Sequence, residues 1–182
     1  MARIPSIDPA DVAPEHRDLL ARPIALHRAL VNSPGALRAF GGLGQYIRHG
    51  STLDPRLREL AILQVGYLAR SPYEWSHHIK IGHDFGVTDA DIVALIAETE
   101  GQASALDSLT RTVLRAAREI TTDGAIGDAS WNTLAATLST EHMVDLVTTI
   151  SFYCAVIRVL ASLRIEVEPD YMPYLERFPL PA

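Results

Sequence analysis

Two glutamates and a histidine are spaced so that they could carry out acid–base chemistry. Glu59 precedes the apolar run LAILQVGYLA, and Glu74 and His78 lie in the segment SPYEWSHH at residues 71–78. Residues four apart on a helix share a face, so the Glu74 carboxylate can orient the His78 ring or raise its pKa. Burial beside an apolar helix would raise the pKa of Glu59 and suit it to proton transfer. We expect Glu59, Glu74 and His78 to be catalytic, with Tyr73 as a weaker proton donor.

Each carboxylate also has a purely structural interpretation. Ser71 and Glu74 form a Ser-x-x-Glu capping box, in which the Glu side chain reaches back to the N–H of the cap residue. This reading is favoured for Glu74. A buried Glu59 needs a partner, which can be Arg56, Arg58 or a more distant arginine.

The histidines do not predict a metal site. Steps of 100° per residue spread His77, His78 and His83 around one helix, so they cannot supply three ligands from one side. The order Glu-x-x-His-His also differs from the His-Glu-x-x-His of metalloproteases. We expect neither a metal nor an organic cofactor, and take Glu59, Glu74 and His78 as a metal-binding set only as a minor alternative.

Three further residues are candidates for substrate binding. Arg158 lies in the apolar run YCAVIRVLASL, so it needs a partner, and a helix carboxylate, of which Glu59 is one candidate, is favoured over a substrate carboxylate. His49, in QYIRHG, suits either a helix C-terminus or a pocket. Trp75 is expected in the core rather than in a stacking platform.

The elements that hold these residues are predicted to be helices throughout. Ser33-Pro34, Asp54-Pro55 and Ser71-Pro72 each place a capping residue before a proline, and a proline suits the first helical position. Only RIEVEP has the alternation of a strand. The chain is therefore predicted to be all-α, with about eight helices, including a short one near residues 13–20.

Composition limits the partners and the compartment. The net charge is −6 and no Lys/Arg-rich run occurs, so a nucleic acid partner is not expected. Asp145 and Arg158 interrupt the longest apolar stretch, which argues against a membrane span. The single cysteine, Cys154, forms no internal disulfide, and no apolar signal segment begins the chain. We expect a cytoplasmic protein with a small-molecule substrate.

The segment from residue 58 to residue 95 resembles the carboxymuconolactone decarboxylase family, which includes the alkyl hydroperoxidase D-like proteins. The matching residues are RELAIL at 58–63, YEW at 73–75, His78 and GVTDADI at 86–92. The resemblance implies an alkyl hydroperoxidase D-like helical bundle that assembles as a trimer or hexamer. The expected organisation is one domain over 1–182, with a wrapping segment at 1–32, a family core at 37–122 and C-terminal helices at 128–165.

The same resemblance separates two activities. In the hydroperoxidase branch a CxxC pair falls at positions that here are Ser71 and Glu74, so this chain lacks the thiolate nucleophile and its resolving partner. The family's decarboxylases need no cofactor. The resemblance thus implies a lyase or isomerase acting on a small anionic lactone or enol acid through Glu59 and His78. The alternative is a non-catalytic oligomeric binding or scaffold protein, and thiol peroxidase chemistry is the least favoured.

Overall fold

The computed structural model describes residues 2–181, and over that range the chain is helical with no strand. The prediction of an all-α fold is confirmed, and the RIEVEP segment is an extended connection rather than a strand. Nine α-helices are present in the described range, close to the eight expected: α1 (Ala25–Leu30), α2 (Pro34–Gln45), α3 (Pro55–Leu68), α4 (Pro72–Asp84), α5 (Asp89–Thr99), α6 (Ser108–Asp123), α7 (Asp128–Ala135), α8 (Thr140–Leu163) and α9 (Met172–Arg177).

Short helices of other types complete the chain near its ends and after α2. Two 3₁₀-helices, Pro9–Asp11 and Pro14–Leu20, precede α1, and a third, Pro169–Tyr171, precedes α9. The helix expected near residues 13–20 therefore exists, but with the tighter winding that suits short runs. A single π-helical turn, Tyr46–Gly50, continues α2.

Helix α3 is the centre of the bundle because nearly its whole circumference is apolar. Every residue from 57 to 67 is buried, and the helix packs against α4, α6 and α8. Gly66 allows the close approach of α4: a Cβ added there would lie 3.3 Å from the backbone nitrogen of Trp75. This packing brings Glu59 of α3 next to the inner face of α4.

Side-chain caps fix where α3 and α4 begin. Asp54 accepts a hydrogen bond from the backbone N–H of Leu57, and Ser71 accepts one from Glu74. Both caps were predicted, since each precedes a proline at the first helical position. Ser33 was predicted to cap α2, but its side chain makes no capping hydrogen bond to any described residue.

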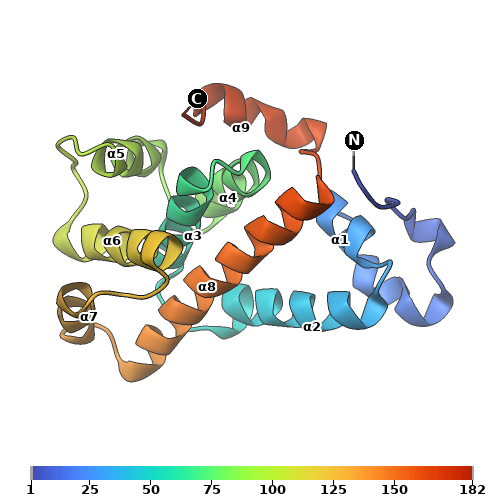
Figure 1. Cartoon of the computed structure of the whole chain (residues 1–182), viewed down its shortest axis with the longest axis horizontal. Helices are drawn as coiled ribbons and strands as arrows, with labels where there is room; N and C mark the ends of the chain where they lie inside the picture. The colour runs from blue at the N-terminus through green and yellow to red at the C-terminus, as the bar shows by residue number, and fades with distance from the viewer. Residues whose placement is uncertain (1, 182) are drawn as a thin grey trace.

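Helix α8 runs diagonally across the bundle, with α5, α6 and α7 on one side and the N-terminal segment on the other (Figure 1). It is long and apolar enough to cross a membrane by length and composition alone, a test that core helices of soluble proteins also pass. In this fold 44% of its most apolar window is buried, and the buried side packs against α3 and α6.

The segment after α8 turns back along α4, on the side away from α3 (Figure 1). The Trp75 indole N–H donates a 2.7 Å hydrogen bond to the carbonyl of Phe178, and both residues are buried. The C-terminal segment therefore supports the helix that carries Glu74 and His78.

Candidate active site

The His78 ring lies between two carboxylates from two helices. Its Nδ1 is 2.7 Å from Oε2 of Glu59 on α3, and its Nε2 is 3.3 Å from Oε2 of Glu74 one turn earlier on α4. All three side chains are at least 95% buried. A carboxylate accepts hydrogen bonds, so the proton of the ring lies on Nδ1, and Nε2 is directed toward Glu74.

The Glu74 side chain does not complete a capping box. Ser71 accepts from the Glu74 backbone N–H, but the carboxylate turns inward toward His78 instead of back to the start of the helix. The favoured structural interpretation of Glu74 is therefore wrong. Its Oε2 is buried and has no hydrogen-bond partner within residues 2–181.

Arg58 is the buried partner of Glu59. Its Nε donates a 3.1 Å hydrogen bond to Oε1 of Glu59, and its guanidinium lies 4.5 Å above the ring of Phe85. The expected pairing of Glu59 with Arg158 is therefore wrong. Arg158 faces solvent from α8 and donates to the carbonyl of Cys154 one turn earlier.

The pKa values of the two carboxylates are shifted in opposite directions. Burial opposes ionisation of Glu59, but the adjacent His78 and Arg58 outweigh it and lower its pKa below 4.5. Burial also raises the pKa of Glu74, and His78 and Arg48 only partly offset that rise. Glu59 therefore holds a charge, and Glu74 retains a proton more readily than an ordinary glutamate does.

A cavity of about 140 Å³ opens beside Glu74 and His78. An apolar cavity of similar size, about 150 Å³, can hold one benzene ring. Its apolar walls come from α1, α2, α4 and α8: Leu26, Phe40, Ile81, Phe152 and Val156. Glu59 is not one of the residues that line the cavity, so it can act only through His78.

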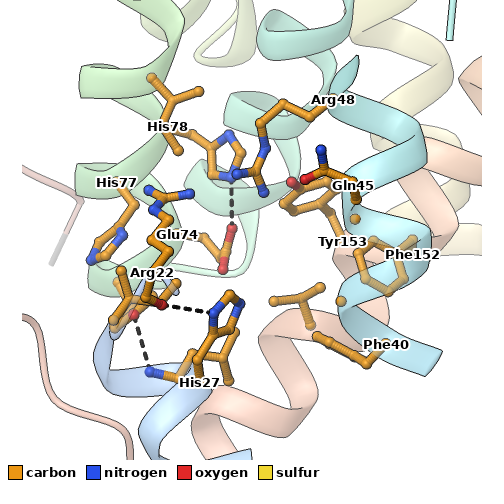
Figure 2. Close-up of a pocket in the computed structure, with 17 residues that line it drawn as sticks. Arg22, His27, Phe40, Gln45, Arg48, Glu74, His77, His78, Phe152 and Tyr153 are labelled. Carbon is orange, nitrogen blue, oxygen red and sulfur yellow. Dashed lines mark hydrogen bonds and ion pairs between the residues drawn. The ribbon is translucent and has the colours of Figure 1, made fainter. Parts of the chain in front are cut away.

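Two arginines add positive charge to this cavity. Arg22 comes from the segment before α1 and Arg48 from the π-helical turn, and both point toward the Glu74–His78 pair (Figure 2). The Nε of Arg48 is buried, and no hydrogen-bond partner for it exists in the described chain. Guanidinium groups bind carboxylates strongly, so the cavity suits a small anion with an apolar ring.

The predicted substrate-binding residues lie outside this cavity. His49 is exposed, with its ring 6.4 Å from that of Phe85. Trp75 is fully buried in the core between α3, α4 and the C-terminal segment, as its structural interpretation required. Arg158 and Cys154 border a separate pocket. None of these three is a cavity-lining residue in the described range.

Tyr73 does line the cavity, but its hydroxyl is held elsewhere. The backbone N–H of Leu26 donates to Tyr73 Oη over 3.2 Å, and the hydroxyl lies 3.3 Å from Oε1 of Glu168. Burial raises the pKa of Tyr73 well above its usual value. The hydroxyl therefore links the start of α1 to Glu168, and its raised pKa makes it a weaker acid than a free tyrosine.

Sequence reasoning missed six polar residues that line the cavity: Arg22, His27, Gln45, Arg48, His77 and Tyr153. The π-helical turn decides that Arg48, and not its neighbour His49, faces the cavity, and no sequence pattern signalled that turn. Arg22 lies in a proline-rich segment without helical periodicity. Within residues 2–181, no group of three or more His, Cys, Asp and Glu side chains is arranged to hold a metal ion.

Comparisons with known proteins agree with this architecture. The model of the carboxymuconolactone decarboxylase family matches residues 34–119, which run from the start of α2 into α6. A search of curated proteins finds no match.

Solved structures resemble three quarters or more of the chain at low identity. A variant of the debrominase Bmp8 in complex with 2,3,4-tribromopyrrole is 18% identical, with a TM-score of 0.81 and 97% of each chain covered. A peroxidase-related protein with an alkylhydroperoxidase AhpD core, from Ralstonia eutropha JMP134, is 15% identical, with a TM-score of 0.79, over 96% of this chain and 95% of that one. A protein of unknown function from Agrobacterium tumefaciens is 22% identical, with a TM-score of 0.66, over 76% of this chain and 94% of its own. At these identities the likeness concerns the fold.

Proposed function

Because this chain belongs to the carboxymuconolactone decarboxylase family through residues 34–119, we propose that it is a cofactor-independent acid–base enzyme of the decarboxylase type, acting on a small anionic lactone or enol acid. The observation that carries the proposal is the His78 ring, held by an ionised Glu59 on one side and facing a proton-retaining Glu74 on the other.

The proton is supplied by Glu74 together with His78. Glu59 fixes the Nδ1–H tautomer of His78, so Nε2 is a basic site beside the Glu74 carboxyl. The raised pKa of Glu74 keeps a proton at this position at a pH where an exposed glutamate is ionised. The pair therefore borders the cavity as a proton donor.

The reaction balances without another reagent. The bond from the ring carbon to its carboxylate breaks, CO₂ leaves, and the electron pair moves into the conjugated carbonyl of the substrate. The proton held by Glu74 beside His78 then goes to carbon, and solvent reprotonates the pair after product release. Arg22 and Arg48 would bind a second substrate carboxylate and the charge that develops on the carbonyl oxygen.

Thiol chemistry is not supported at this cavity. The positions that hold the redox cysteines in the hydroperoxidase branch are Ser71 and Glu74 in this chain. The one cysteine of the chain, Cys154, lines a different pocket and lies 3.6 Å from the Thr121 hydroxyl.

A non-catalytic binding protein remains the second candidate, since a cavity with two arginines also suits simple retention of an anion.

The test is CO₂ release from 4-carboxymuconolactone by the wild type and by Glu59→Gln, Glu74→Gln and His78→Ala. We expect kcat/KM to fall by about 10²-fold or more in each variant, because each removes part of one proton-transfer unit. His49→Ala is the matched control, since that histidine is exposed and lies outside the cavity. Binding of the substrate without turnover in folded wild-type protein would favour the binding protein instead.

A further inference from the structure

Glu168, in the extended segment after α8, joins three parts of the chain that are distant in sequence. Its Oε1 accepts a 2.6 Å hydrogen bond from the backbone N–H of Ala25 and lies 3.3 Å from the Tyr73 hydroxyl. Its Oε2 lies 2.8 Å from Nε2 of His77. A single carboxylate thus ties the beginning of α1 to the outer face of α4.

The ring of His77 is held in place by stacking as well as by this contact. The Tyr73 ring lies parallel to it at 4.0 Å between centroids, and the Tyr171 ring lies on it at 3.5 Å. Burial lowers the pKa of His77, so a neutral ring donates its Nε2–H to the Glu168 carboxylate. Glu168 therefore belongs to a packed cluster with Ala25, Tyr73, His77 and Tyr171, which we call the joint.

The same contacts also fix one wall of the cavity, the wall formed by residues 22–27, which precede the family core in the sequence. Next to the amide of Ala25, the N–H of Leu26 is bound by Tyr73, which itself contacts Glu168. The His27 ring donates through Nδ1 to the carbonyl of Arg22 over 2.9 Å. The backbone that carries Arg22 is therefore connected to Glu168 within a few residues, and Figure 2 shows Arg22 and His27 joined in this way beside Glu74.

We propose that Glu168 is a positioning residue for the anion site: it holds the segment 22–27 against α4 and thereby directs the Arg22 guanidinium into the cavity. The inference rests on the proposed function only in assigning an anion to this cavity. Glu168 itself is not one of the residues that line the cavity, as far as the described chain shows, so its effect on binding must pass through Arg22 and its neighbours.

Amide hydrogen exchange tests the joint without any substrate. In Glu168→Ala the amides of Ala25 and Leu26 should exchange about 10-fold faster or more, because a charge-assisted hydrogen bond to the first is lost and Tyr73 loses its own partner. Glu168→Gln keeps an acceptor oxygen and should show a smaller effect. Glu176→Gln, an exposed carboxylate on α9, is the matched control and should leave both amides unchanged.

Benzoate, one ring with one carboxylate, is the binding probe, measured by calorimetry. Glu168→Ala and Arg22→Gln should each weaken benzoate binding by about 10-fold, and the double variant should be scarcely weaker than Arg22→Gln alone, because both changes remove the same contact. Additive losses, or benzoate binding that does not respond to Glu168→Ala, would show that Glu168 supports only the fold and would overturn the proposal. A wild type that does not bind benzoate would instead contradict the anion cavity itself, and the proposed function with it.

Discussion

Glu59 and Glu74 approach opposite nitrogens of one imidazole ring, yet the pKa of Glu59 is lowered and that of Glu74 is raised, although both side chains are buried. The difference comes from the hydrogen bonds that Glu59 makes to His78 and to Arg58, since the Oε2 of Glu74 has no hydrogen-bond partner in the described range. Carboxylates with pKa values driven apart can divide the two roles of a general acid and an orienting base.

This division predicts a bell-shaped pH dependence of kcat/KM for decarboxylation. Activity should be lost as the pH falls through the lowered pKa of Glu59, below 4.5, because a protonated Glu59 no longer fixes the His78 tautomer. It should also be lost as the pH rises through the raised pKa of Glu74, because the donor then loses its proton. A pH–rate profile of Glu74→Gln should lack the alkaline limb of the wild type. The same alkaline limb in both proteins would assign that proton to another group.

Removing Arg58 should destabilise the fold. Arg58→Met leaves the buried Glu59 charge without its partner, and loss of one member of a buried pair costs about 3–5 kcal/mol. Urea unfolding of Arg58→Met and of the control Arg158→Met, whose side chain is exposed, measures the difference. Adding Glu59→Gln to Arg58→Met should recover part of the loss. A cost below about 1 kcal/mol for Arg58→Met would contradict a charged Glu59.

The stability of the wild type should depend on Glu168 in acid. Burial opposes its ionisation, but hydrogen bonds from His77 and from Ala25 lower the pKa of Glu168 from 4.5 to about 2. A lowered folded-state pKa stabilises the protein above pH 4.5, and this contribution is lost as the pH falls toward 2. Chemical unfolding at several pH values should show a shallower decline for Glu168→Gln than for the wild type over this window. Parallel declines would mean that the carboxylate titrates normally.

The homo-oligomer expected from the family resemblance should involve the exposed face of α8. Val144 is 58% exposed on that helix, and Ser151 and Ala155 continue its solvent-facing side. Val144→Glu and Ala155→Arg should each shift the protein toward monomer in sedimentation velocity, because charges are disfavoured in the core of an interface. Val93→Glu is the control, since Val93 on α5 is equally exposed at 58%. A wild type that sediments as a monomer would contradict this assembly.

Local rules predicted the helices well, because the caps and prolines act within a few residues. The proximity of Glu59 and His78 also followed from the family resemblance, since both residues lie in its motif. The capping box failed at Glu74 because a tertiary contact with His78 competes with the local one. The pairing of Arg158 failed because its helix presents that position to solvent, which depends on how α8 packs.

The rest of the cavity depends on contacts between distant segments. Arg22 reaches it only because Glu168 and Tyr73 hold the start of α1, some 143 and 47 residues away in the chain. Arg48 reaches it only because α2 ends in a wider turn. Neither arrangement has a short-range sequence pattern.

The proton-transfer residues lie inside the stretch 34–119, whereas much of the cavity wall lies outside it, before α2 and on α8. In the proposed function, the proton-transfer residues therefore all lie within this stretch, whereas the anion-binding arginines are divided between it, at Arg48, and the flanking segment, at Arg22. Exchanging the flanking segments between relatives should change part of the ligand preference and leave the Glu–His pair in place. A bundle of this kind can acquire new substrates without rebuilding its catalytic centre.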